Sequence, residues 1–160
     1  METNVHAVPE GFHALTPCLT LKNSLEAIEF YKRAFGARQL EVFPSPDGRG
    51  TMHALIQIGD SVLMMGDERP ECDSKSAASL GASPISLCLY VPDADATFEQ
   101  ALAAGASSVM PVQDVFWGDR CGTVKDPFGY TWMIGTHVRD LSRQEIREGA
   151  QAFFAASAGH

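Results

Sequence analysis

The chain has 160 residues, 45% of them hydrophobic and 20% charged, which is typical of one globular domain and excludes an intrinsically disordered protein. Twelve basic against twenty acidic residues give a formal net charge of −8, so we expect neither nucleic acid nor membrane as a partner, since both present negative surfaces. No apolar run is long enough for a transmembrane helix, and residues 1–6 lack the basic and apolar regions of a signal peptide, so we expect a cytoplasmic protein.

The first half of the chain predicts one strand, one helix and three further strands. Residues 15–21 alternate larger apolar and small polar side chains, which is the period of a strand with one face in a core. A helix follows over residues 23–36, because a capping pattern opens it and a glycine ends it. Four apolar side chains recur on the predicted core-facing side of this helix: Leu25, Ile28, Tyr31 and Phe35. Residues 39–43, 51–58 and 61–65 are the three predicted strands, with polar turns between them.

The same order of elements returns in the second half. A strand at residues 85–91 is followed by a helix from Asp93 to Gly105. Three further strands are predicted, at residues 107–112, 119–124 and 130–134. The spacing of about 70 residues also aligns single residues, Cys18 with Cys88 and Met64 with Met133.

These elements predict an α+β fold made of two β-α-β-β-β modules in one domain, residues 1–160. The modules fall at about residues 13–66 and 85–136. Between them, residues 67–84 form an acidic and polar stretch that we expect to be a solvated linker.

A helical tail is predicted within residues 137–160. Ser142 and Glu145 form a capping-box pattern, and Ile146, Phe153 and Phe154 fall on one apolar face. Either the body of the chain or a second copy must cover that face.

Each predicted strand has an apolar face and a second face, which we call the mixed face because small and polar side chains share it. On the mixed faces lie His53 and Gln57 of one module, and Ser86 and Tyr90 of the other. Such a lining suits a concavity with a few placed polar groups. The alternative is an antiparallel sheet whose mixed face simply meets water.

Three segments together, residues 24–31, 53–58 and 116–129, resemble the vicinal oxygen chelate superfamily. The chain is most similar to its PhnB-like branch, which is grouped with glyoxalase and bleomycin-resistance proteins. The resemblance runs from about residue 15 to residue 136. It implies that each module curls its four strands into half of a barrel around a ligand cavity, with the helices outside, and that the protein is a homodimer.

Most enzymes of that superfamily hold a divalent metal through four ligands, from the first and fourth strands of each module. The resemblance places these four positions on Thr16, Met64, Ser86 and Met133. Hydroxyls and thioethers are poor ligands for the metals that a glyoxalase or dioxygenase needs. We therefore expect a metal-free cavity and no cofactor.

Two groups of residues are the strongest candidates for recognition. His53 lies on a mixed face, where it can act as a general base or bind a ligand near neutral pH, although a hydrogen-bonded structural histidine is the alternative. Trp117, Asp119 and Arg120 can hold a polar organic molecule by stacking and charge-assisted hydrogen bonds. The alternative for them is a surface salt bridge beside a core tryptophan. The predicted ligand-binding set is Thr16, His53, Gln57, Met64, Ser86, Tyr90, Trp117, Asp119, Arg120 and Met133.

The favoured function is therefore a binding protein for a small polar or partly aromatic molecule, as in the bleomycin-resistance proteins that sequester a drug. An enzyme of the same fold, a lyase, isomerase or dioxygenase, is the second hypothesis, because His53 can serve as a base. A structural or partner-binding protein is the third, and applies if the protein's own side chains fill the cavity.

Overall fold

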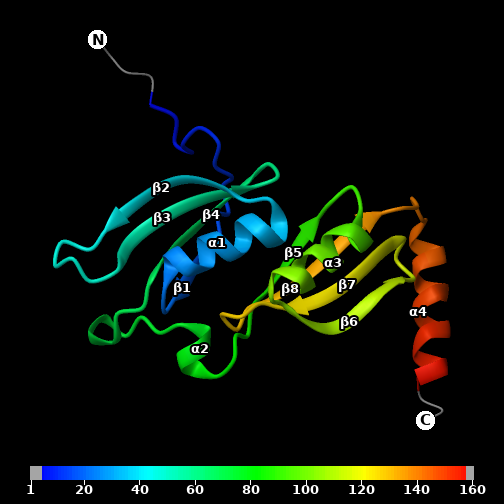
Figure 1. The fold of residues 1–160 in the computed structure, drawn as a ribbon. Helices are drawn as coiled ribbons and strands as arrows, with labels where there is room; N and C mark the ends of the chain where they lie inside the picture. Colours follow the sequence, from blue (N-terminus) through cyan, green and yellow to red (C-terminus); the bar gives the residue numbers. More distant parts are fainter. Residues whose placement is uncertain (1–4, 158–160) are drawn as a thin grey trace. The chain divides into compact units, whose positions relative to one another are not determined.

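The computed structural model describes residues 5–157, which divide into two compact units (Figure 1). The first unit extends to Pro84 and includes the short segment Phe128–Tyr130. The second contains Ile85–Pro127 and the residues from Thr131 onward.

The first unit is a four-stranded mixed sheet with one long helix. Its elements are β1 (Cys18–Leu21), α1 (Ser24–Phe35), β2 (Arg38–Pro44), β3 (Thr51–Ile58), β4 (Ser61–Asp67), η1 (Pro70–Cys72) and α2 (Ala77–Leu80). The strand order is β1-β4-β3-β2, in which β1 is parallel to β4 and the other pairs are antiparallel. Figure 1 shows α1 lying along one face of this sheet.

The second unit repeats this topology and adds a helix. Its elements are β5 (Ser86–Tyr90), α3 (Ala94–Ala104), β6 (Ser107–Asp114), β7 (Asp119–Lys125), β8 (Thr131–His137) and α4 (Arg143–Ser157). The order is β5-β8-β7-β6, with β5 parallel to β8. Cys18 lies opposite Met64 in the first sheet and Cys88 opposite Met133 in the second. The predicted α+β fold with two β-α-β-β-β modules and an extra C-terminal helix is confirmed, and both sheets are open.

The first helix begins and ends where the sequence predicts. The Asn23 side chain accepts a hydrogen bond from the Glu26 amide at 3.2 Å, and Gly36 adopts a left-handed conformation, φ 66°, that ends the helix. Leu25, however, is 52% exposed, so its predicted place in the core is wrong. The core-facing side of the helix lies opposite Leu25. Its buried residues are Ser24, Ala27, Ile28, Phe30, Tyr31 and Ala34.

A turn from the second half of the chain completes the core of the first unit. The Phe128 ring lies 5.7 Å from the Phe30 ring, edge to face. The Tyr130 hydroxyl donates to the Thr20 carbonyl at 2.7 Å.

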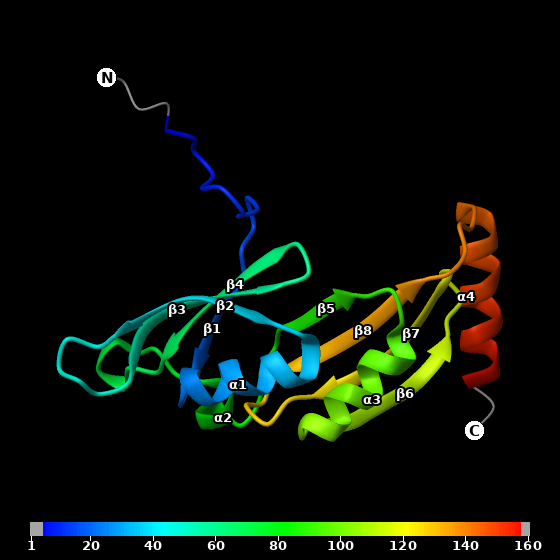
Figure 2. The ribbon, with the colours of Figure 1, turned by 45° about the horizontal axis from the view of Figure 1, so that its top comes forward.

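In the second unit, α3 lies along the sheet and packs on β7 (Figure 2). Phe98 is 4% exposed and lies over Gly122, where an added Cβ would come within 2.9 Å of its ring. A larger residue at position 122 would therefore clash with α3, so the packing requires a glycine there. Val124, Trp132 and Ile134 complete this buried layer.

The stretch predicted as a solvated linker is bound to the first unit by its carboxylates. Asp67 ends β4 and accepts hydrogen bonds from the amides of Ser24 (2.7 Å) and Thr51 (2.9 Å). Glu68 accepts from the Ser76 amide at 2.8 Å at the start of α2. Asp67 thus ties the stretch to α1 and β3, and Glu68 holds the start of α2 within it.

The capping box of the tail helix is confirmed, because Ser142 and Glu145 exchange hydrogen bonds at 2.8 and 3.3 Å. Within the described residues α4 buries no side chain, and Phe153 and Phe154 are 53% and 66% exposed. The Phe153 ring lies 5.8 Å from the Phe116 ring, which holds one side of the helix against the sheet end. None of the described helices is long and apolar enough to span a bilayer.

Candidate functional site

The mixed face of each module is the sheet face turned away from its helix. In β3, Ala54 and Ile56 are fully buried, whereas His53 and Gln57 on the other side remain half-exposed. This alternation places polar side chains on one open surface in each unit.

A groove of about 280 Å³ lies on the mixed face of the first unit. This volume is close to the lower end of the roughly 300–1,000 Å³ typical of small-molecule sites. Strands β1, β3 and β4 and the loop after β4 form its walls, with these side chains among the lining: Cys18, Thr20, Met52, His53, Arg69 and Ser74.

The groove depends on a glycine in β4. Gly66 lies opposite Thr20 and is one of the residues that line the groove. An added Cβ at Gly66 would lie 2.8 Å from the Met52 carbonyl oxygen, closer than real contacts allow. The backbone of β3 approaches Gly66 this closely because no side chain is present.

His53 is half-buried in this groove and has an aromatic neighbour. Its ring stacks on Phe43, with centroids 6.4 Å apart and planes 26° apart. Within residues 5–157 its imidazole makes no hydrogen bond to protein. His53 is therefore not the hydrogen-bonded structural histidine of the alternative, and both of its ring nitrogens are open to a ligand.

Arg69 lines the same groove and is not among the residues predicted from the sequence. One guanidinium nitrogen, Nη2, donates to Ser45 Oγ at 3.0 Å. Among the described residues no carboxylate forms an ion pair with Arg69. Its position just after the last strand of the first module is the only signal that the sequence offers.

The other predicted residues of the first module lie outside the groove. Thr16 precedes β1 and donates to the His13 carbonyl at 2.8 Å, because the predicted strand 15–21 begins only at Cys18. Gln57 accepts a hydrogen bond from Arg38 Nη2 at 2.6 Å. Met64 is half-buried on β4.

In the second unit a buried carboxylate gathers three donors on the mixed face. Asp119 is 2% exposed, and its Oδ2 accepts from Tyr90 Oη at 2.8 Å and Trp117 Nε1 at 2.9 Å. Its Oδ1 accepts from His137 Nδ1 at 2.7 Å. Burial raises the pKa of Asp119, but these hydrogen bonds outweigh it and the pKa lies below its ordinary value.

His137 links this carboxylate to the segment before α4. Its Nε2 lies 3.0 Å from Asp140 Oδ1, so the imidazole has a carboxylate at each nitrogen. The bonds to Asp119 and Asp140 raise the pKa of His137, and the bond to Asp119 raises the pKa of Tyr90 to about 12. The network therefore keeps His137 charged over a wider pH range and keeps the tyrosine protonated.

His137 and Asp140 lie beyond the predicted last strand, which ends at residue 134, whereas β8 continues to His137. Extending the alternation from Met133 by two more steps places His137 on the mixed face, so this histidine was within reach of the pattern.

Tyr90 also fills the position that is open in the first module. It lies opposite Gly135 in the second sheet, as Thr20 lies opposite Gly66 in the first. An added Cβ at Gly135 would be 3.6 Å from Tyr90 Cε1, so the tyrosine ring lies over the glycine.

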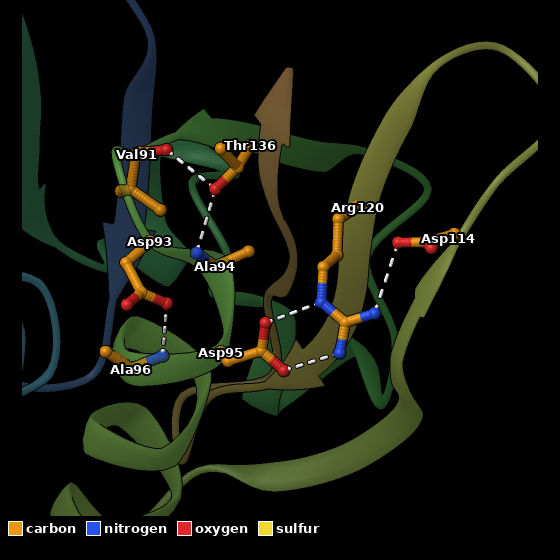
Figure 3. A network of polar contacts seen from close by, with 8 residues as sticks. All are labelled: Val91, Asp93, Ala94, Asp95, Ala96, Asp114, Arg120 and Thr136. Atoms are coloured by element: carbon orange, nitrogen blue, oxygen red, sulfur yellow. Dashed lines mark hydrogen bonds and ion pairs between the residues drawn. The ribbon is translucent and has the colours of Figure 1, made fainter. Parts of the chain in front are cut away.

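Figure 3 shows Arg120 reaching toward Asp95 and Asp114. Because it follows Asp119 directly in β7, its side chain lies on the other face of the strand. Its Nε and Nη2 donate to the Asp95 carboxylate on α3 at 2.6 and 2.7 Å. Its Nη1 donates to Asp114 at 3.2 Å. The structure thus brings together Trp117, Asp119 and Tyr90 from the predicted set, but not Arg120, which forms a surface salt bridge.

The remaining two predicted residues lie on β5 and β8. Ser86 is exposed at the start of β5, opposite Thr131, and Met133 is half-buried opposite Cys88.

The residues at the superfamily's metal positions do not fit a divalent metal. Met64 and Met133 each have a cysteine as the neighbouring residue on the parallel strand, so sulfur replaces the usual oxygen and nitrogen donors. The part of the chain that the structure describes contains no group of three His, Cys, Asp or Glu side chains arranged to hold a metal ion.

Comparison with known proteins identifies relatives over most of the chain. The profile of the Glyoxalase/Bleomycin resistance protein/Dioxygenase superfamily matches residues 13–134. The uncharacterized protein Mb0911c of Mycobacterium bovis is 42% identical over 137 residues, 84% of this chain and 90% of that protein. YjdN of Escherichia coli is 31% identical over 141 residues, 75% of this chain and 92% of that protein.

Solved structures share the architecture. TioX from Micromonospora sp. ML1 is 27% identical, with a TM-score of 0.63 over 79% of this chain and 99% of that one. The PhnB protein from Bacillus cereus has a TM-score of 0.60 over 78% of this chain and 99% of that one, and at 18% identity it shows the fold alone.

Proposed function

The chain belongs to the glyoxalase, bleomycin-resistance and dioxygenase superfamily, and we propose that it binds a small organic molecule, without a metal ion, on the mixed face of its first module. The observation that carries this proposal is His53, a half-buried imidazole without a protein hydrogen bond in the described structure, inside a groove of small-molecule size. Because no protein group occupies its ring nitrogens, the imidazole can hydrogen-bond a ligand in the groove, which favours a function in binding.

An enzyme of the same fold is the second candidate, and the same histidine favours it. An imidazole with both nitrogens open can take or give a proton near neutral pH. Turnover would then require a substrate whose acidic proton lies next to His53.

We also propose a homodimer, in which a second copy covers the exposed rings of α4. Phe153 and Phe154 form an apolar surface that the described part of the second unit leaves open.

The binding proposal is tested on the purified protein in two steps. Elemental analysis and native mass spectrometry measure metal content and any retained ligand, and thermal shifts with nickel, zinc and manganese measure added metal. A small-molecule screen by thermal shift then compares the wild type with His53→Ala. The control is His13→Ala, an exposed histidine outside the groove.

We expect no stoichiometric metal, and a ligand-induced shift that His53→Ala loses and His13→Ala keeps. One tightly bound ion per chain would contradict the metal-free proposal. A ligand that binds His53→Ala as well as the wild type would contradict the placement of the site.

A further inference from the structure

We propose that the groove of the first module selects organic acids, whose carboxylate binds Arg69 while an apolar body lies along the groove floor. This inference rests on the proposed binding function and names its ligand class.

The guanidinium of Arg69 is held in place and remains available. Its backbone closes a loop with Ser74, through hydrogen bonds of 2.8 and 3.1 Å in the two directions. Its side chain is fixed by the bond to Ser45 on the β2–β3 hairpin. A guanidinium has five N–H donors, so most of them have no acceptor among the described residues.

Asp67 and Glu68, the two acidic residues that precede Arg69 in the chain, are already bound by the protein, whereas Asp47 and Glu71 line a neighbouring pocket of about 450 Å³ with Arg69. Asp67 uses one oxygen for the Ser24 amide and the other for the Thr51 amide. The Ser24 amide belongs to the first turn of α1, so the carboxylate faces the positive end of that helix. A cationic ligand would have to compete with these amides for Asp67.

Glu68 is bound in a similar way. The Ser76 amide and the Ser79 hydroxyl donate to its two oxygens, at 2.8 and 2.9 Å. The hydrogen bonds from Ser76 lower the pKa of Glu68 to about 2. Asp67, the one carboxylate that lines this groove, is therefore hydrogen-bonded through both oxygens, whereas most donors of Arg69 are not, so an anion is the group that suits the groove.

The rest of the lining determines the remainder of the ligand. Met52, which is 45% exposed, contributes apolar surface, and the His53 ring extends the aromatic surface of Phe43. An arginine binds a carboxylate through two parallel hydrogen bonds, and a flexible methionine adapts to an apolar body. A small aromatic or aliphatic acid satisfies both halves of the groove.

The test uses matched acids and amides of nearly equal shape. The probes are benzoate with benzamide, phenylacetate with phenylacetamide, and hexanoate with hexanamide. Binding to the full chain is measured by calorimetry and by the NMR signals of His53. The variants are Arg69→Gln, Arg69→Lys and, as a matched control, Arg49→Gln, which removes a nearby arginine that does not line this groove.

We expect at least one acid to bind about tenfold or more tightly than its amide, which is the size of a charge-assisted contact. Arg69→Gln should abolish this preference, Arg69→Lys should keep part of it, and Arg49→Gln should leave it unchanged. Ser45→Ala is a second variant in case Arg69→Gln fails to fold. It removes the hydrogen bond between Ser45 and Arg69 but keeps the positive charge of Arg69. It should weaken acid binding less than Arg69→Gln does.

The outcomes separate this inference from the proposed function. If amides bind as well as acids, or if Arg69→Gln keeps the preference, the organic-acid inference is wrong and the binding function stands. If no probe and no molecule of the general screen binds, the proposed function is wrong and the inference falls with it.

Discussion

Replacing Asp119 by alanine tests whether the mixed face of the second module depends on one buried carboxylate. The substitution removes the acceptor of Tyr90 and of Trp117, which both donate to Oδ2. Hydrogen bonds to a charged group contribute about 1.5–3 kcal/mol each. Because the two donors share one oxygen atom, they do not add fully, and we expect a loss of about 3 kcal/mol in the free energy of unfolding. His137 is left out of this figure, since its ring is open to water.

Urea unfolding followed by tryptophan fluorescence measures this loss. Both tryptophans of the chain, Trp117 and Trp132, lie in the second unit, so the signal reports on the unit that contains Asp119. The control is Asp114→Ala, which removes an exposed carboxylate from Arg120 and should shift the midpoint little. Equal and small effects of the two substitutions would refute the reasoning, because Asp119 would then contribute no more than a surface carboxylate.

His53→Ala should lower the free energy of unfolding by less than about 1 kcal/mol, since only a ring stack is lost, and circular dichroism in urea measures this; a loss of several kcal/mol would make this histidine structural. Folding raises the pKa of His137, so the stability that its charged form contributes should be complete below the unfolded-state pKa of 6.5 and should be lost as the pH rises through the folded-state pKa. Unfolding measured across this pH range should show the loss in the wild type and not in His137→Gln. Gly66→Ala should cost about 1–3 kcal/mol by forcing a Cβ against a backbone carbonyl, and should also abolish ligand binding; unchanged thermal stability would contradict the close approach. Light scattering should give twice the chain mass of 17.3 kDa for the wild type and a monomer for Phe154→Glu, whereas a monomeric wild type would contradict the dimer.

The sequence predicted what short-range patterns determine. Asn23 and Gly36 bound the first helix because capping depends on neighbouring residues alone. The strand containing His53 was predicted with its observed bounds, since alternation places every second side chain on the same face.

Contacts between distant segments were beyond these patterns. Asp67 was expected in a solvated linker because nothing local indicates that two distant amides would bind it. Arg69 was overlooked for the same reason, since its exposure to the groove follows from the closure of the loop onto Ser74. Arg120 is a different case: it follows Asp119 directly, so the period of a strand already places the two on opposite faces.

The contrast between Gly66 and Gly135 bears on how many molecules one chain can carry. A duplicated fold offers two equivalent places for a guest, one in each copy. Here the first copy leaves its place open beside Thr20, whereas the second covers it with the ring of Tyr90, held by Asp119. We therefore predict a valency of one for the proposed ligand: a titration should saturate at a single equivalent along a simple hyperbola, and a second equivalent would contradict the difference between the two copies.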